Sequence, residues 1–388
     1  MTDAVLVLLL LAAVGSARWL LWDLRTVPRG GGDCVTAASV SVVIPARDEE
    51  ATLPTLLGSL RRLATPVSEV VVVDDGSKDE TASVARSAGV VVLPAAAPPP
   101  GWTGKAWACH LGARASRGEL VLFLDADTVL APDALDGLLE LHHRHGGLVS
   151  VQPFHTVGRP YEHLSSYFNV VSLLASAAFV RNPAGRRGNR PMAFGPCLLS
   201  SREDYEHTGG HAAVRGEILD DVELAAAYSR AGLPVRCAVG GRAVHMRSYP
   251  GGFRQLADGW TKNIASGASA AARGPALAAV LWVSAHHAVA VGAALAVLEA
   301  VTGWGAPLTY GAPALWAVAW VGVAWQLRSM LRRIGSFGWW TWALFPVPLL
   351  AFDALFLRSA ALTVVRRSVR WRGREVHLGS RGPAEEPL

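Results

Sequence analysis

The chain has 388 residues, of which 51% are hydrophobic and only 17% are charged, and it contains 14 tryptophans. This length exceeds one typical domain, and the apolar content is high for a purely soluble enzyme, so contact with a membrane is expected. The net charge of +5 includes a group of arginines near the C-terminus, which favours a basic surface against anionic lipid over nucleic-acid binding. These are Arg366, Arg367, Arg370, Arg372 and Arg374.

The first segment, residues 4–17, is an uncharged apolar run that is extended past Arg18 to Trp22. A signal-peptide core is one interpretation, but a signal peptide carries basic residues ahead of such a run, and here only Asp3 precedes it. Arginines follow it instead, so the positive-inside rule places the N-terminus outside and the remaining chain in the cytosol. We therefore expect an uncleaved anchor over residues 1–24 and a linker over residues 25–38.

Strand and helix patterns then alternate along the chain. Short apolar runs typical of strands lie at residues 39–44, 70–73, 90–93, 120–129, 148–152, 193–200, 233–240 and 242–246. Helical spacing occurs between them at residues 49–62, 104–117, 132–145 and 221–230. This alternation predicts an α/β fold whose mostly parallel sheet is covered by helices on both faces. We expect this catalytic domain to occupy residues 39–272.

Two segments inside this domain have a different pattern. Residues 164–180 are apolar on most sides, which fits a core helix and a helix in the membrane interface equally well. Residues 251–266 form a mixed amphipathic stretch with basic residues and Trp260, which suits a membrane surface.

The C-terminal third is predicted to meet the membrane over residues 273–365. The uncharged stretches within residues 273–299 and 299–328 are long enough to span it as a hairpin. Residues 338–365 are broken by Pro346 and Pro348, and a single span there would place the following arginines outside. We prefer a re-entrant or interfacial helix pair, which keeps a basic tail of residues 366–388 in the cytosol. The expected product is a multi-pass protein of the cell membrane with a cytosolic catalytic domain.

The strand pattern around residue 120 ends in two carboxylates, Asp125 and Asp127. In open α/β sheets the carboxyl ends of the strands face the ligand crevice. Two acidic side chains placed there, one residue apart, suit a hard divalent cation that also holds phosphate. The sequence therefore predicts a metal–diphosphate site.

Five motifs in a fixed order resemble those of family 2 glycosyltransferases, and the resemblance covers about residues 39–269. They are VIPARDEE at 43–50, DDGSKDET at 74–81, Gly104-Lys105, Asp125-Ala-Asp127 and DDVEL at 220–224. The resemblance implies the GT-A fold, a Rossmann-like, nucleotide-sugar-binding mixed sheet. It also implies an inverting transfer that uses a divalent metal, Mg²⁺ or Mn²⁺, and a nucleotide-sugar donor.

A finer resemblance lies in RSYP at 247–250, GWTKN at 259–263 and VRWRGR at 369–374. Together with the predicted anchors, these residues are similar to the membrane-bound branch that contains carotenoid-acid (4,4'-diaponeurosporenoate) glycosyltransferases, and more distantly to ceramide glucosyltransferases. The resemblance implies a lipid acceptor. Gly259 stands where related polymer-forming synthases have arginine in a (Q/R)xxRW motif, which argues against processive synthesis.

The resemblance assigns donor-binding roles to several residues, and each has a structural alternative. Asp75 would accept hydrogen bonds from uracil, or form an Asx turn. The side chains expected near the nucleoside, or at a solvated helix start, are Pro45, Arg47 and Glu49. Lys105 would meet the diphosphate as a point charge, or be a solvated lysine.

The metal set implied by the resemblance begins with Asp127, while Asp125 would touch the ribose or the metal. His245, on a late strand, is a candidate third ligand or a structural histidine. Trp260 and Lys262 would close over the diphosphate and acceptor, or anchor the chain at the membrane interface.

The catalytic base is expected among Asp220, Asp221 and Glu223, because an inverting transfer needs one carboxylate to take the acceptor's proton. The resemblance selects Asp221, and its acidic neighbours favour a raised pKa. An acid-rich helix N-terminus is the structural alternative.

These residues together predict transfer of a single sugar, from a UDP-sugar, to the hydroxyl or carboxylate of a lipid such as a carotenoid acid. Synthesis of a cell-envelope glycolipid or polysaccharide is one alternative. A nucleotidyltransferase would need a Gly-rich, Arg-containing loop after the first strand, and residues 45–50 are not such a loop. A catalytically inactive membrane scaffold would be expected to lose Asp125, Asp127 or Asp221, and all three are present.

Overall fold

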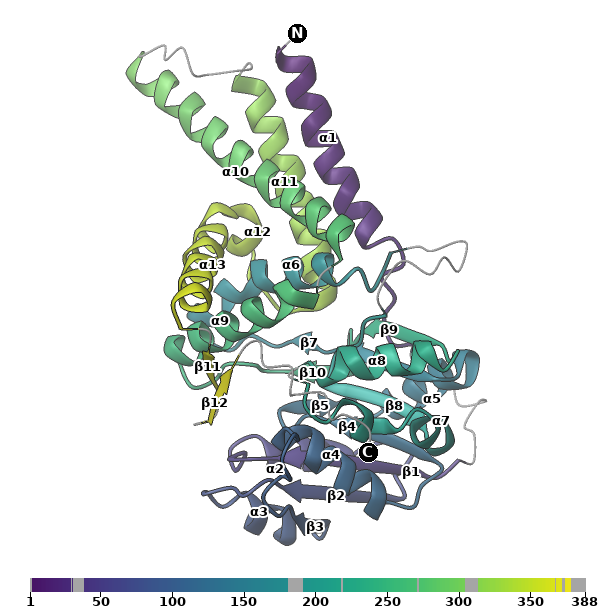
Figure 1. Ribbon diagram of the computed structural model, residues 1–388. Coiled ribbons are helices and arrows are strands. Elements are labelled where there is room, and N and C mark those ends of the chain that lie inside the picture. The colour runs from purple at the N-terminus through teal and green to yellow at the C-terminus, as the bar shows by residue number, and fades with distance from the viewer. Residues whose placement is uncertain are drawn as a thin grey trace, which may run out of the picture.

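The computed structural model describes residues 2–28, 30, 38–180, 191–217, 219–270, 272–303, 313–366, 368–371 and 374–377. Its main sheet has seven strands in the order β3 (Val91–Pro94), β2 (Glu69–Asp74), β1 (Val40–Ala46), β4 (Leu120–Leu124), β8 (Cys197–Ser201), β6 (Leu148–Gln152) and β9 (Val235–Val239) (Figure 1). All neighbouring pairs are parallel except those that β8 makes with β4 and β6. The predicted mixed, parallel-rich α/β sheet is thus confirmed.

Apolar side chains cover both faces of this sheet, as strands buried on two sides require. One face packs against α2 (Leu53–Leu60), α3 (Thr81–Ser87) and α5 (Ala134–His145). The other face packs against α4 (Gly104–Ala115), α7 (Arg202–His207), the short 3₁₀ helix η2 (Gly210–Val214) and α8 (Asp220–Arg230). Both helix layers leave the carboxyl ends of the parallel strands accessible.

The predicted strand over residues 120–129 is in fact two strands, because the chain turns at Asp125–Asp127. After this turn β5 (Thr128–Leu130) leaves the main sheet and joins β10 (Val244–Met246) and β7 (Phe154–His155) in a three-stranded sheet. Two backbone hydrogen bonds, each 3.0 Å long, fix the turn. The Asp125 amide donates to the Pro196 carbonyl, and the Thr128 amide donates to the Asp125 carbonyl.

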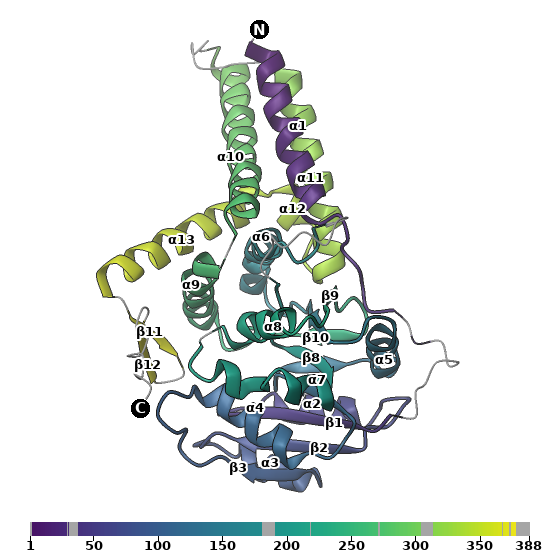
Figure 2. The same cartoon turned by 45° about the vertical axis from the view of Figure 1, so that its right-hand side comes forward.

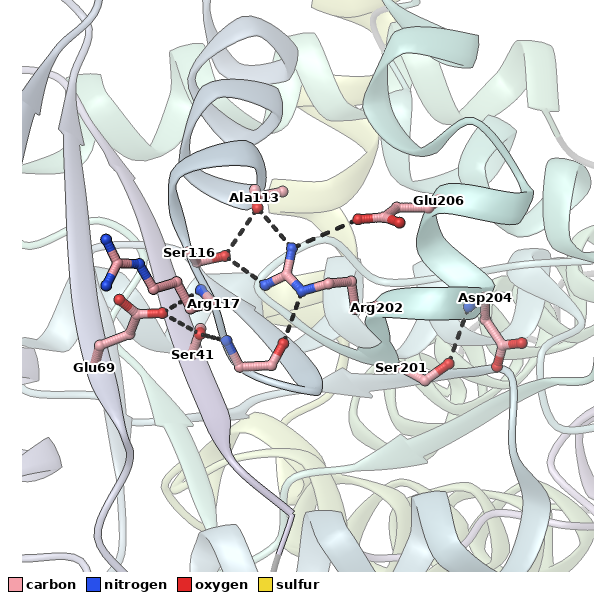
Figure 3. A network of polar contacts seen from close by, with 10 residues as sticks. Ser41, Glu69, Ala113, Ser116, Arg117, Ser201, Arg202, Asp204 and Glu206 are labelled. Atoms are coloured by element: carbon pink, nitrogen blue, oxygen red, sulfur yellow. Dashed lines mark hydrogen bonds and ion pairs between the residues drawn. The ribbon is translucent and has the colours of Figure 1, made fainter.

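The amino ends of the central strands are tied together by a polar network around Arg202 (Figure 3). The Arg202 guanidinium donates to the carbonyls of Gly118 and Ala113 at 2.8 and 2.9 Å, and to Ser116 Oγ at 3.0 Å. Ser41 on β1 accepts from the Gly118 amide at 2.7 Å. This network fixes the α4–β4 connection and thereby the position of the carboxyl end of β4.

The remaining helices form a separate apolar core beside β9 (Figures 1 and 2). Three long helices lie side by side: α1 (Thr2–Leu20), α10 (Arg273–Thr302) and α11 (Pro313–Ile334). Between them and the sheet lie η1 (Pro160–Ser165), α6 (Ser166–Ser176), α9 (Phe253–Ala270), α12 (Trp340–Ala343) and α13 (Pro346–Arg366). A two-stranded hairpin, β11 (Ser368–Trp371) with β12 (Arg374–His377), follows α13.

Several sequence expectations are refined by these helices. Residues 164–180 prove to be a core helix, since Tyr167, Phe168 and Leu174 of α6 are fully buried. In the segment after residue 338, α12 ends just before Pro346, where α13 begins. Residues 25–27 pair with β9 instead of forming a free linker. Most of the predicted linker and basic tail (residues 29, 31–37, 367, 372–373 and 378–388) lies outside the described residues.

Within the described part of the chain, α10 alone is long and apolar enough to cross a membrane by length and composition. Residues 7–20 form a shorter apolar helix, and α11 does not meet the same test. The structure therefore supports one candidate span, and the N-terminal anchor and second C-terminal span remain expectations.

We expect Arg202→Met to lower the free energy of unfolding by about 2 to 3 kcal/mol, because two carbonyls in the α4–β4 connection lose a charged hydrogen-bond donor. The matched control is Arg144→Met, whose pair with Glu140 lies on the exposed side of α5 and should contribute less than about 1 kcal/mol. Thermal melting of the two purified variants beside the parent chain measures both. Equal melting temperatures for the two variants would contradict a stabilising role for the network.

Candidate active site

A pocket opens at the carboxyl ends of β1 and β4, where the first residues of α4 and α8 also meet. It combines four predicted site residues, Pro45, Lys105, Asp125 and Asp221, which come from four separate motifs. Its other lining residues are Cys109, Phe123, Leu124, Gly195, Leu198, His211 and Asp220. The sheet topology therefore brings together the residues that the sequence places far apart.

Lys105 supplies the positive charge of the pocket. It lies in the first turn of α4, which Thr103 caps by accepting from the Ala106 amide. Its Nζ is 2.8 Å from Asp125 Oδ1. Burial opposes the charged form, but the carboxylates of Asp125 and Asp220 outweigh it and raise the pKa of Lys105. The amine is thus a permanent cation at the start of a helix, where anions are also favoured.

Asp221 provides a carboxylate with an unusual proton affinity. Burial, together with the neighbouring Asp220 charge, raises the pKa of Asp221 to about 6, and Lys105 limits the rise. The Asp221 Oδ2 atom accepts from the Gly195 amide at 2.8 Å, which holds the side chain toward the pocket. A carboxylate with a pKa near 6 is suited to general-base catalysis near neutral pH.

Asp220 is the more deeply buried member of the pair. It is 8% exposed, and among the described residues its Oδ2 atom has no hydrogen-bond partner. Burial raises the pKa of Asp220, against the attraction of Lys105. The buried, unpartnered oxygen adds to the cost of ionising Asp220 next to Asp221.

Gly195 was not singled out from the sequence, although it separates the key charges. A Cβ atom there would lie 3.2 Å from Asp221 Oδ2 and 3.3 Å from Lys105 Nζ. The adjoining Pro196 carbonyl accepts from the Asp125 amide at 3.0 Å. The Gly195–Pro196 segment therefore connects the two carboxylate motifs and leaves open space between them. The Gly-Pro pair before a strand was the only available signal.

His211 and Cys109 are further lining residues that sequence reasoning missed. Burial and the nearby Lys105 charge lower the pKa of His211 to about 3, so its ring is neutral. The ring forms a hydrogen bond with the Tyr205 hydroxyl. Burial likewise raises the pKa of the Cys109 thiol. Neither adds charge to the pocket, which leaves Lys105 and the carboxylates to determine its electrostatics.

The predicted nucleoside-binding loops lie beside the pocket at the ends of β1 and β2. Backbone amides and short polar side chains bind the two loops together, through Asp48 with Ser77 and Lys78, and through Glu49 with Thr81. Arg47 Nη1 is 3.4 Å from Asp75 Oδ2 across this junction. The arrangement gives a preformed surface with a paired guanidinium and carboxylate.

Asp79 accepts from the Thr81 amide at 3.0 Å and thereby organises the start of α3.

The turn between β4 and β5 carries both predicted metal-binding carboxylates. Oxygen ligands of this kind fit Mg²⁺ or Mn²⁺, which commonly bind one or two carboxylates and take their other ligands from phosphate and water. Among the described residues, no group of three His, Cys, Asp or Glu side chains is assembled to hold a metal. The donor set therefore suits an ion that arrives with a diphosphate.

The other predicted site residues lie away from the pocket lining. His245 Nε2 is 2.8 Å from the Arg242 carbonyl oxygen, and the ring contacts Phe154 edge-on. Trp260 is 6% exposed, stacks on Phe168 and donates to Ser165 Oγ at 3.1 Å. Lys262 follows on the same helix, α9. Their roles toward metal, diphosphate and acceptor stay predictions.

Comparison with known proteins agrees with this geometry. Residues 41–209 match the family model "Glycosyl transferase family 2". The chain is 34% identical over 344 residues, 88% of each chain, to the 4,4'-diaponeurosporenoate glycosyltransferase of Staphylococcus aureus (strain MRSA252). It is 37% identical over 252 residues, 64% of this chain and 66% of the relative, to the enzyme of the same name from Staphylococcus haemolyticus (strain JCSC1435).

The fold is also similar to a solved structure, the mannosyltransferase PcManGT from Pyrobaculum calidifontis in complex with GDP-Man and Mn²⁺. The TM-score is 0.51 at 20% identity, covering 94% of this chain and 99% of the other. This likeness shows a shared glycosyltransferase fold, including the helices outside the sheet domain. The chain is a family 2 glycosyltransferase of the 4,4'-diaponeurosporenoate glycosyltransferase group.

Proposed function

We propose that this protein is a membrane-anchored, inverting hexosyltransferase that moves one sugar from a UDP-sugar to the hydroxyl or carboxyl group of a lipid such as a carotenoid acid. The observation that carries the proposal is that Lys105, Asp125 and Asp221 line the same pocket. A cation for a diphosphate, a carboxylate for a metal and a carboxylate of raised pKa are the groups that such a transfer needs. The names of the relatives supply the acceptor class.

The donor would lie with its nucleoside against the Arg47–Asp75 pair and its diphosphate toward Lys105. Asp127, with Asp125, would hold the divalent ion, which neutralises the charge that develops on the departing nucleoside diphosphate. Asp125 is already ion-paired with Lys105, so both positive groups would share one carboxylate beside the phosphates. His245 is proposed as a further ligand.

Asp221 would act on the acceptor. Its carboxylate, held by the Gly195 amide, takes the proton of an acceptor hydroxyl as the oxygen attacks the anomeric carbon. The bond from that carbon to the diphosphate would break at the same time, and the nucleoside diphosphate would leave with the bonding electron pair. Trp260 and Lys262 on α9 are proposed to border the closed site.

The membrane part of the proposal is supported by where large apolar side chains are exposed. Almost all such side chains among the described residues lie on or next to the helices α1, α10, α11, α12 and α13. They include Leu8, Leu11, Leu277, Val280, Val291, Val297, Val301, Val318, Val321, Trp325, Leu350 and Leu357. Exposed apolar surface of this extent marks contact with a membrane or a partner.

Charge at the ends of these helices indicates the orientation. Arg18 in the last turn of α1, Arg273 at the start of α10 and Arg332 in the last turn of α11 all lie at the end nearest the sheet (Figure 1). The Arg18 and Arg328 guanidinium groups also lie over tryptophan rings at this level. Positive charge and tryptophan favour the cytosolic interface, so the catalytic domain is proposed to be cytosolic.

We expect Asp221→Asn to lower kcat for a hydroxyl acceptor by about 10² to 10⁴, because the amide cannot take the proton. For the parent chain the rate should fall about tenfold per pH unit below pH 6, since protonation of a base with a pKa near 6 removes its active form. The variant should lack this decline. Initial rates from pH 4.5 to 8 with a UDP-sugar series and a lipid alcohol test both expectations. A parent chain that uses no nucleotide sugar would overturn the proposal.

Removal of divalent metal by EDTA is expected to abolish transfer, and Mn²⁺ or Mg²⁺ to restore it. Asp127→Asn should raise the Mn²⁺ concentration needed for half-maximal rate by about tenfold or more, because a charged ligand is lost. Asp133→Asn, on the far side of β5, is the matched control and should behave like the parent chain. If the Asp127 variant needs the same Mn²⁺ concentration for half-maximal rate as the parent chain, Asp127 is not a metal ligand.

A topology test uses single cysteines at exposed positions, with the reactivity of the parent chain subtracted. We expect Arg86→Cys on α3 to react with a membrane-impermeant maleimide in inverted membrane vesicles but not in intact cells. Thr302→Cys, at the opposite end of α10, should show the reverse pattern. Labelling of both positions from the same side would contradict a spanning α10 with a cytosolic catalytic domain.

A further inference from the structure

A second pocket lies where the three-stranded sheet meets the helical core. Its walls come from the residues that follow β7, from the Ser248–Tyr249 segment that follows β10, and from Phe337 between α11 and α12. Buried polar residues of η1 and α6, Glu162, Ser165 and Asn169, complete the lining. The cavity therefore has a polar interior, although it adjoins the apolar helices.

The register of the three-stranded sheet places this cavity beside the metal-binding turn. Met246 of β10 pairs with Thr128 of β5 on one side and with His155 of β7 on the other. Asp127, which precedes Thr128, and Ser248 and Tyr249, which follow Met246, thus lie at the same edge.

Three hydroxyl groups of the cavity have protons to donate, because their oxygens already accept hydrogen bonds. Ser165 Oγ accepts from Trp260 at 3.1 Å, and Tyr249 Oη accepts from Asn263 at 3.3 Å. Ser248 Oγ lies 3.2 Å from His155 Nδ1, whose other ring nitrogen is 2.9 Å from Gln152 Nε2. With the amide of Gln152 as donor there, His155 donates to Ser248. The proton of Ser248 is itself directed at Met246 Sδ, 3.5 Å away, and this weak acceptor can be replaced by a ligand oxygen.

The charge in the cavity is balanced. Glu162 accepts from Arg247 at 2.6 and 3.2 Å and from the Gly158 amide at 2.9 Å, so both of its oxygens are occupied. Burial lowers the pKa of His155 to about 4, and the ring is neutral. A ligand that only accepts hydrogen bonds suits such a site. A ligand that donates a proton is less suited, because the strongest acceptor, the Glu162 carboxylate, already accepts from Arg247 and Gly158.

We infer that this cavity binds the carboxylate of the lipid acceptor, with Ser165, Ser248 and Tyr249 as hydrogen-bond donors. The inference rests on the proposed function and adds the position and chemistry of the acceptor site. The carboxylate lies beside the metal-binding turn, and the lipid tail extends toward Phe337 and the apolar helices. The ring of Tyr249 packs against Gly259 and occupies the space of its missing side chain. A Cβ atom at Gly259 would lie only 2.3 Å from Tyr249 Cε1.

The test compares a polyene acid with its alcohol, all-trans-retinoic acid with retinol, as ligands of the full-length protein in detergent. Binding is measured by quenching of tryptophan fluorescence, without nucleotide sugar. We expect the acid to bind the parent chain at least tenfold more tightly than the alcohol. The double variant Ser248→Ala/Tyr249→Phe should lose this preference. Ser176→Ala, on α6 but outside the cavity, is the control and should keep it.

Kinetic measurements give a second, independent readout. With a carotenoid acid as acceptor, the double variant should raise the acceptor KM at least tenfold and change the donor KM by less than threefold. Equal binding of acid and alcohol by the parent chain, or unchanged acid preference in the double variant, would overturn the inference. Failure of the proposed function would look different, because a chain that uses no nucleotide sugar can still prefer the acid in the binding assay.

Discussion

The balance of charge around Lys105 is the interaction on which the active site depends. One ammonium group faces Asp125 directly and attracts Asp220 and Asp221 behind it. Without the cation, three carboxylates at the ends of β4 and α8 would repel one another and take up protons. With it, one acid is ion-paired and another keeps a proton affinity near neutrality. The fold serves this balance by fixing α4 against β4.

Much of the site was predictable because family 2 motifs follow the ends of strands, and strand ends are visible as apolar runs. The pocket brings the motifs of Lys105, Asp125 and Asp221 together. The sequence did not reveal Gly195, since its importance comes from a side chain that is missing. Nor did it reveal Tyr249 or Ser165 as lining residues, because the cavity forms between segments more than eighty residues apart.

The fold was predicted less well where local pattern and tertiary packing compete. The strand pattern continued through residue 129, yet the polar turn at Asp125–Asp127 is bonded to Pro196 and redirects the chain into a second sheet. Residues 164–180 had no decisive periodicity, and only the surrounding helices determine that α6 is buried. The helical patterns after residue 273 predicted helices correctly, but hydropathy alone distinguishes α10 from α11.

The three-stranded sheet has a consequence for the order of events. Its central strand, β10, pairs on one side with the strand that begins after Asp127 and on the other with the strand that leads into the second cavity. For a donor and an acceptor bound as proposed, ordering of β10 by one ligand would lower the entropic cost of ordering it for the other. Such coupling is reciprocal, so the factor by which a bound donor improves acceptor affinity equals the factor by which the acceptor improves donor affinity. Three short strands thereby connect the two proposed ligand sites through one shared element, β10.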